Sequence, residues 1–380
     1  MIESKRYINA FCYFALCLLG VYLSVYQSVV ADIALDYHLD AGQTGMMISF
    51  HFLGSFLLPL ILGEAGDRFG TKPILRLAFM TLIAGLVFII AGRVPVLFLI
   101  GTLLVGGGFS VIEGMLSGLL TLANPDRVNS VMNLSQMYFC LGAVGGPFVV
   151  FGLKLAGWGW RINYSLILIL FLVCLIVAGR LSLPAYRTAP IKGLQLKRLL
   201  RDRTFIILLI AIFLYVGVEE GTAFWVTSYI KEALTTQVPG LIFLSVYWLG
   251  MACGRWLFSM LKQSFKRWLI IGLAAACLFM CSFLLLQQSG WVLICLFLVG
   301  FGFAPVWPVL MMTASDRGTD ATNSAMGAMM SLGAVGGMAV PFALGQLANS
   351  TGMTRAMLLM PLLLFVLMGL VLSTGRKRKD

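Results

Sequence analysis

The stretch Leu141-Gly-Ala-Val-Gly-Gly146 occurs a second time as Leu332-Gly-Ala-Val-Gly-Gly337, 191 residues further along a chain of 380. Two shorter pairs keep the same order at offsets of 194 and 190 residues, namely Asn129-Ser-x-Met132 with Asn323-Ser-x-Met326, and Asp126-Arg127 with Asp316-Arg317. A single glycine-rich match can arise by chance in an apolar chain. Three ordered matches at about half the chain length indicate an internal duplication. The sequence therefore predicts two similar halves.

The composition around these stretches is typical of a membrane protein. Apolar residues make up 60% of the chain, charged residues only 11%, and the mean hydropathy is +0.97, whereas a water-soluble domain carries about 25% charged residues. A cytosolic enzyme, a secreted disulfide scaffold and a disordered chain are excluded. The 8 cysteines lie in apolar stretches without metal-ligand spacing, so we interpret them as reduced hydrophobic residues and expect no metal site.

Breaking the chain at charge clusters and Pro/Gly clusters leaves twelve apolar segments long enough to span a bilayer, which takes about 20 residues. They are residues 8–31, 42–63, 73–92, 95–120, 130–153, 160–181, 204–230, 238–261, 268–288, 291–314, 321–348 and 354–374. We expect an all-α membrane protein built from two pseudo-symmetric six-helix bundles. The first bundle is assigned to residues 1–182, a cytoplasmic linker to 183–203, and the second bundle with a basic cytoplasmic tail to 204–380.

The basic residues are distributed unevenly over the two sides of this arrangement. With both termini inside, 22 of the 27 Lys and Arg residues, Arg255 among them, are assigned to the inner side and 5 to the outer side. The positive-inside rule then predicts cytoplasmic termini in a multi-pass protein of the plasma membrane, the inner membrane of a bacterium. The net charge of +12 is thus a topology signal and requires no nucleic acid. The expected partners are the lipid bilayer and a small-molecule substrate, and a monomer is expected.

Between the second and third segments the chain reads Gly63-Glu-Ala-Gly-Asp67-Arg68-Phe-Gly70-Thr-Lys72. This resembles G-x-x-x-D-R-x-G-x-[KR], the cytoplasmic signature of the major facilitator superfamily. The resemblance implies the major facilitator fold, in which two six-helix halves rock about a central site. It also implies a cytoplasmic gate formed by Gly63, Asp67, Arg68, Gly70 and Lys72, where the acid and the bases make charge-assisted contacts. The alternative is an ordinary solvated turn.

Within the superfamily, the chain resembles the fucose-proton symporter-like branch. The similar stretches are Asn133-Leu-Ser-Gln136-Met-Tyr138-Phe-Cys-Leu141-Gly142-Ala143, Glu113 after a glycine run, Tyr215-Val-Gly-Val-Glu219 with Trp225, and Gly302-Phe-Ala304-Pro305-Val-Trp-Pro308. This resemblance implies proton-coupled sugar transport. The chain departs from the branch at Gln27, near the place of an aspartate, and at Ser117, in place of an asparagine. Gly142-x-x-x-Gly146-Pro147 partly resembles a pattern of proton-driven exporters, which keeps export open.

Three of the 15 acidic residues lie inside the apolar segments, namely Glu113, Glu219 and Glu220. A carboxyl group at membrane depth must face a water-filled cavity or hold a proton, and these are properties of a proton carrier. We interpret the three glutamates, together with His51, as proton-coupling residues. The alternative for each is a structural hydrogen bond. Because neighbouring residues point about 100° apart on a helix, we expect only one of Glu219 and Glu220 to face the cavity.

Amide and aromatic side chains in the same segments are candidates for binding the substrate. They are Tyr22, Tyr26, Gln27, Asn133, Gln136, Trp225 and Trp307. Amides can both donate to and accept from sugar hydroxyls, and aromatic rings suit the C–H face of a sugar, although packing is the alternative for each ring. Pro305 and Pro308 predict a bend in the tenth segment.

These residues favour a secondary active transporter that works by alternating access. The predicted function is proton-coupled symport of a small polar solute, a monosaccharide or related carbohydrate. The alternative is a proton-coupled antiporter that exports drugs or metabolites. Because the chain lacks His-Glu-x-x-His and Gly-x-Ser-x-Gly, we do not expect an enzyme. No cofactor is expected beyond the coupling ion, a proton, and sodium also stays open.

Overall fold

The computed structural model describes residues 2–181, 183, 199–260, 265–317 and 322–373, and their regular structure is helical throughout. Twelve helical stretches within this part of the chain are long and apolar enough to cross a membrane. They coincide with the twelve predicted segments to within a few residues. The predicted fold class, an all-α membrane protein with twelve spans, is therefore confirmed. The predicted linker, 183–203, lies mostly outside the described residues, and the domain boundaries remain predictions.

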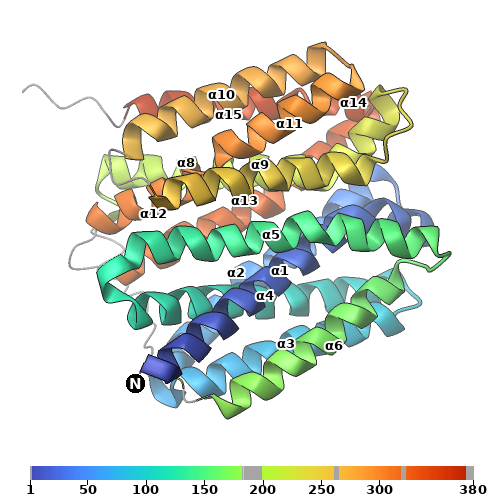
Figure 1. Ribbon diagram of the computed structural model, residues 1–380. Helices are drawn as coiled ribbons and strands as arrows, with labels where there is room; N and C mark the ends of the chain where they lie inside the picture. The colour runs from blue at the N-terminus through green and yellow to red at the C-terminus, as the bar shows by residue number, and fades with distance from the viewer. Residues whose placement is uncertain (1, 182, 184–198, 261–264, 318–321, 374–380) are drawn as a thin grey trace, which may run out of the picture.

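The helices follow one another in two series (Figure 1). The first series comprises α1 (Ile2–Asp36), α2 (Ala41–Phe69), α3 (Thr71–Ala91), α4 (Pro95–Ala123), the short η1 (Pro125–Arg127), α5 (Val128–Leu155) and α6 (Arg161–Arg180). The second comprises α8 (Arg203–Ala233), α9 (Gly240–Met260), α10 (Phe265–Leu285), α11 (Ser289–Phe303), α12 (Val306–Arg317), α13 (Thr322–Thr351), α14 (Met353–Ala356) and α15 (Leu359–Ser373).

The tenth span is broken at the point where its prolines predicted a bend. A single stretch, Ser289–Ala314, contains α11 and α12, which are separated by Ala304 and Pro305. Pro305 has no N–H to donate to the preceding turn, and its ring crowds the carbonyl four residues earlier. The helix therefore ends at Phe303 and begins again at Val306. The helix is thus interrupted where the bend was predicted.

The two series pack by the same scheme, as the internal duplication predicts. In the first series α5 packs on α1 and α4 packs on α2, and in the second α13 packs on α8 and α11 packs on α9. The two copies of the repeated stretch lie in α5 and α13. A side chain at Gly142 would strike the backbone carbonyl of Cys17 in α1, and one at Gly336 would strike that of Phe213 in α8. Gly142 and Gly336 stand at different positions of the repeated stretch, and in each half one of its glycines lets the helix backbones approach closely.

The two series meet along two further helix pairs, α2 with α13 and α5 with α9. Figure 1 shows α5 and α9 side by side across the middle of the molecule. Ser49 Oγ in α2 donates to the carbonyl of Met338 in α13 at 2.8 Å, and Ser245 Oγ in α9 donates to that of Val144 in α5 at 3.1 Å. We call the end where α1 begins and α15 ends the termini end. The Ser49 and Ser245 contacts lie between the middle of the helices and the opposite end.

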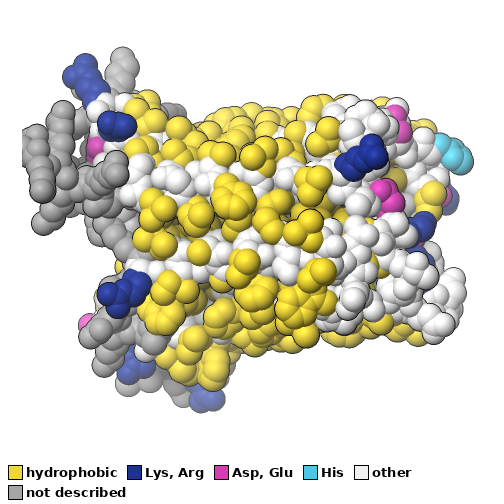
Figure 2. All heavy atoms as spheres, turned by 90° about the horizontal axis from the view of Figure 1, so that it is seen from above, with side chains coloured by type: hydrophobic (Ala, Val, Ile, Leu, Met, Phe, Trp, Pro, Cys, Tyr) yellow, Lys and Arg dark blue, Asp and Glu magenta, His cyan; other side chains and the backbone are white. Residues whose placement is uncertain are grey.

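The outer surface matches a chain that spans lipid. Apolar side chains cover the flank of the molecule, and the charged ones gather toward its two ends (Figure 2). At the opposite end Lys154 pairs with Asp32 at 2.8 Å, and Arg161 pairs with Asp36 at 2.7 Å. The arrangement leaves an apolar band between two polar ends, as a bilayer requires.

Candidate substrate and proton site

A cavity of about 120 Å³ lies where the two helix series meet. Its walls come from α1, α2, α4 and α5 of the first series and from α8, α9, α12 and α13 of the second. Six of the predicted site residues line it, namely His51, Glu113, Gln136, Glu219, Glu220 and Trp307. The three glutamates that sequence analysis singled out therefore share one space.

Glu113 and Gln136 face each other across the first series. Gln136 Nε2 on α5 donates to Glu113 Oε1 on α4 at 3.2 Å. Both side chains also line the cavity. An amide donor stabilises either a carboxylate or the carbonyl oxygen of a protonated carboxyl group. Glu113 can thus hold or release a proton without losing this partner.

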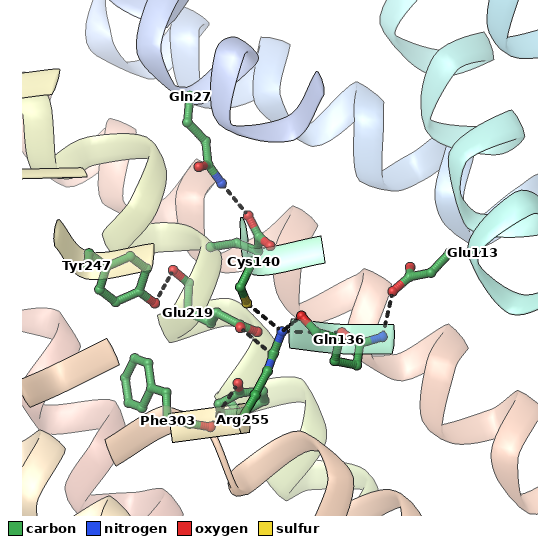
Figure 3. A network of polar contacts seen from close by, with 10 residues as sticks. Gln27, Glu113, Gln136, Cys140, Glu219, Tyr247, Arg255 and Phe303 are labelled. Carbon is green, nitrogen blue, oxygen red and sulfur yellow. Dashed lines mark hydrogen bonds and ion pairs between the residues drawn. The ribbon is translucent and has the colours of Figure 1, made fainter. Parts of the chain in front are cut away.

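Arg255 on α9 is the centre of the polar network in Figure 3. Its Nη2 pairs with Glu219 Oε1 at 3.4 Å, and its Nη1 contacts Gln136 Oε1 at 3.3 Å and Cys140 Sγ at 2.9 Å. Only 3% of Arg255 is exposed. Our assignment of this residue to the inner-side charges was therefore wrong. The ion pair links α9 to α8, and the Gln136 contact links the second series to the first.

Glu220 lies next to Glu219 in sequence but bonds in another direction. Gln27 Nε2 on α1 donates to Glu220 Oε2 at 3.0 Å, and Trp248 Nε1 on α9 donates to Gln27 Oε1 at 3.0 Å. Both glutamates line the cavity, so the expectation that only one would do so was wrong. The reason is the position of α8, which contacts both α1 and α9. Two directions about 100° apart on this helix therefore both point toward the centre.

The other predicted residues lie behind the wall of the cavity. The Tyr22 hydroxyl lies 3.3 Å from His51 Nδ1, Tyr26 donates to the carbonyl of Met47, and Trp225 donates to that of Pro341. Together with buried Asn133, these residues are absent from the described lining of the cavity. Tyr22 contacts His51, which lines the cavity. The hydroxyl of Tyr26 joins α1 to α2, and the indole of Trp225 joins α8 to α13.

The predicted gate is described only in part. Gly70 has a φ of 79°, in the left-handed region that favours glycine, and it separates α2 from α3. Lys72 Nζ donates to the carbonyl of Leu181 at 2.9 Å, which ties the start of α3 to the end of α6. The surroundings of Gly63 and the side chains of Asp67 and Arg68 lie outside the part of the structure that is described. Their role as a gate remains a prediction.

Among the residues of the cavity wall that sequence reasoning missed, Arg255 and Trp248 matter most, because both belong to the polar network. A usable signal existed for Arg255, because it lies inside the predicted segment 238–261 and a charge at membrane depth is itself a sign of function. Trp248 offered no such signal, since tryptophan is common in apolar segments and its indole N–H finds a partner only in the folded chain.

Comparison with known proteins gives one family. The family model of the Major Facilitator Superfamily matches residues 12–341. The structure superimposes on the E. coli fucose:proton symporter FucP with a TM-score of 0.70 at 17% identity, covering 99% of both chains. It superimposes on the nucleoside transporter NupG with a TM-score of 0.75 at 14% identity, covering 98% of this chain and 100% of that one. At these identities the likeness shows the fold.

Curated relatives match shorter parts of the chain. The 2-nitroimidazole transporter of Escherichia coli K12 is 28% identical over 168 residues, 44% of this chain and 41% of that protein. The hexuronate transporter of Bacillus subtilis 168 is 25% identical over 257 residues, 61% of this chain and 58% of that protein. The chain thus spans about half the length of these relatives. Both relatives are transporters, and their named substrates differ.

Proposed function

Because the chain belongs to the major facilitator superfamily, and so to a family of multi-pass membrane transporters, we propose that it carries a small polar solute in symport with protons. The solute is a monosaccharide or a related carbohydrate. The halves alternate between two states around a central site, as in other members of this fold. The proposed location is the inner membrane of a bacterium, with both termini in the cytoplasm and the chain working as a monomer.

One observation carries this proposal. Glu113, Glu219 and Glu220 come from two helices, one in each half, and line a single cavity. Unpaired charge at membrane depth is costly, so carboxyl groups without a cation beside them hold protons. Among the described lining residues Arg255 is the one with a permanent positive charge. At least one of the three glutamates therefore carries a proton that it can exchange with the cavity.

The rest of the cavity suits a hydroxylated solute. Gln136 supplies an amide that donates and accepts, and Trp248 and Trp307 supply ring faces. Sugar recognition needs both kinds of group, because a sugar has hydroxyl edges and a C–H face. The solute that suits these groups has a small ring with several hydroxyl groups.

The contacts between the halves support alternating access. The Ser49–Met338 and Ser245–Val144 hydrogen bonds join the halves on the side of the cavity toward the opposite end. With cytoplasmic termini, this arrangement closes the outer side. Opening the outer side would require these contacts to break while the halves close at the termini end.

The glycine pattern that suggested an exporter has a packing role in this structure. Side chains at Gly142 and Gly146 would strike Cys17 and Ser24 of α1. Close packing of α5 on α1 is thus enough to account for these glycines. No described contact of this stretch favours export over import.

The test of this proposal measures the proton movement that a substrate induces. Cells or right-side-out vesicles containing the protein are given sugars, sugar acids, other organic acids and dyes in turn, and the external pH is recorded. A solute that alkalinises the medium as it enters supports symport, and repeating the assay in sodium-free buffer separates proton from sodium coupling. Extrusion of a dye driven by the proton gradient, with no response to any sugar or acid, would establish export instead.

A further inference from the structure

Arg255 is buried in the wall of the transport cavity but is held weakly by its neighbours. Its contacts with oxygen atoms are long: Gln136 Oε1 and the Gln136 backbone carbonyl lie at 3.3 Å and Glu219 Oε1 at 3.4 Å, beyond the usual length of a charge-assisted hydrogen bond, which is about 2.7–2.9 Å. At the surface, by comparison, Arg161 Nη1 lies 2.7 Å from Asp36 Oδ2. The neighbours of Arg255 therefore do not use its full capacity to bind oxygen.

One edge of the Arg255 guanidinium is only half used. Nε is buried and has no hydrogen-bond partner among the described residues. Nη2, on the same edge, meets a single oxygen of Glu219. This edge is the one that forms two parallel hydrogen bonds with a carboxylate. A buried donor without an acceptor destabilises the protein, so a ligand that brings two oxygens to this edge removes that cost.

We infer that Arg255 binds a carboxylate of the transported solute, which makes the solute a small hydroxylated carboxylic acid such as a sugar acid. The inference rests on the transport function proposed above and specifies its substrate. Arg255 is the lining residue with a permanent positive charge in the described wall. Gln136, Trp248 and Trp307 are left to bind the hydroxyl groups and the ring. A second carboxylate would find no further cation in the described wall, so the solute is a monoanion.

Binding in this way also couples the solute to a proton. When the solute carboxylate takes the Nε–Nη2 edge, Glu219 loses its cationic partner. The titratable groups that face it are then Glu113 from α4, Cys140 from α5, Tyr215 and Glu220 on its own helix, and Tyr247 from α9, whose hydroxyl donates to the Glu219 carbonyl. None of these supplies a positive charge, so Glu219 takes up a proton from the solution on the entry side. One anion and one proton cross together, and no net charge moves.

The test uses matched pairs of solutes that differ only in this charge. Full-length protein in proteoliposomes is offered D-glucuronate and D-glucuronamide, then D-galacturonate and D-galacturonamide, together with the neutral sugars. We expect an inward proton gradient to accumulate at least one acid more than about tenfold better than its amide, a difference of about 1.4 kcal/mol. A membrane potential clamped with potassium and valinomycin should leave uptake of that acid unchanged.

Variants separate recognition from folding. Arg255→Gln should abolish the preference for acid over amide, and Arg255→Lys, which keeps the charge but loses the fork, should weaken acid binding more than about tenfold. Binding is measured on purified protein as a ligand-induced rise in melting temperature, so each variant also reports its own folding. Arg161→Gln is the matched control and should keep the preference, because Arg161 lies far from the cavity among charges at the opposite end.

Three results would overturn the inference. Proton-driven uptake of neutral sugars with no uptake of acids, unaffected in KM by Arg255→Gln, would leave sugar symport standing and make Arg255 structural. Equal acid binding by Arg255→Gln and the unmodified protein would also refute it. Failure to transport any member of the panel, with a cationic dye extruded by the gradient, would refute both this inference and the proposed symport.

Discussion

Arg255 and Glu219 form an ion pair between α9 and α8, with side chains 3% and 8% exposed. A pair of this kind stabilises the fold little by itself, because both charges have lost their contact with water. Removing one partner is costly, since it leaves the other charge buried and unpaired, and in soluble proteins this costs about 3–5 kcal/mol. During the transport cycle each of these two charges must therefore keep its partner or exchange it for another group of opposite charge.

We expect Arg255→Gln to lower the melting temperature of the purified protein and Glu219→Gln to lower it as well. The double variant should recover much of the loss, because it leaves neither charge unpaired. Thermal unfolding in detergent, followed by intrinsic fluorescence, measures the four proteins of this cycle. Strictly additive losses would show that the two side chains do not interact in the folded protein.

Glu113→Gln should abolish uphill accumulation of the solute and leave solute exchange at equilibrium nearly intact. The amide cannot carry a proton, yet it can still accept the hydrogen bond from Gln136 that the structure shows at 3.2 Å. Counterflow in proteoliposomes measures exchange, and uptake under a proton gradient measures accumulation. The matched control is Asp40→Asn just before α2, where the carboxyl accepts from the backbone N–H of Gln43. If accumulation survives in Glu113→Gln, coupling does not need Glu113, and the proton that Glu219 takes up on solute binding is sufficient.

Most of the fold could be predicted from the sequence, because each span is specified locally. A bilayer requires about 20 apolar residues in helical form, and the repeated stretch in α5 and α13 disclosed the duplication. The prolines of the tenth span, Pro305 and Pro308, also act locally, and the break between α11 and α12 follows from them. None of these predictions required knowledge of which helices touch.

The site was less predictable, because it depends on contacts between residues far apart in sequence. Gln27 and Glu220 are separated by 193 positions, and the sequence pattern of neither helix predicts their contact. Tyr22 and Gln136 are both polar residues in apolar segments, yet one supports His51 from behind and the other lines the cavity. The direction of a side chain in a twelve-helix bundle is set by helix rotation, which the sequence specifies only through packing.

Contact between α2 and α13 should control which side of the transporter is open. A side chain at Gly45 would lie 3.0–3.2 Å from backbone atoms of Pro341 and Phe342, so Gly45→Leu should separate the two helices near the opposite end. We expect loss of transport in a protein that still folds. A cysteine at Ser49, which contacts Met338 in α13, should then react faster with a membrane-impermeant maleimide added on that side.

Two controls accompany the Gly45 variant. Gly152→Leu makes the same substitution in α5 at a glycine with no neighbour within 4 Å, and it should leave the labelling rate and transport unchanged. Protein without the Ser49 cysteine reports the background from native cysteines. An unchanged labelling rate in Gly45→Leu, together with normal transport, would show that this contact does not close the transporter.

The repeated stretch offers a test of close packing within a single helix. At Gly142 a methyl group would strike the carbonyl of Cys17, whereas at Gly145, three residues on, no atom lies within 4 Å. Alanine at Gly142 should destabilise the protein by about 1–3 kcal/mol through overpacking. Alanine at Gly145 should be neutral or should stabilise by about 0.5–1 kcal/mol, because glycine weakens a helix interior.

The second half supplies a related test at another position of the repeated stretch, because Gly336 is the equivalent of Gly145 and not of Gly142. A methyl group at Gly336 in α13 would strike the carbonyl of Phe213 in α8, so Gly336→Ala should cost about as much as Gly142→Ala, roughly 1–3 kcal/mol. Melting temperatures and the yield of monodisperse protein measure all three variants. If Gly142→Ala and Gly336→Ala are as stable as Gly145→Ala, the first helix of each half does not pack backbone to backbone on α5 and α13. The duplicated stretch would then need another explanation than helix contact.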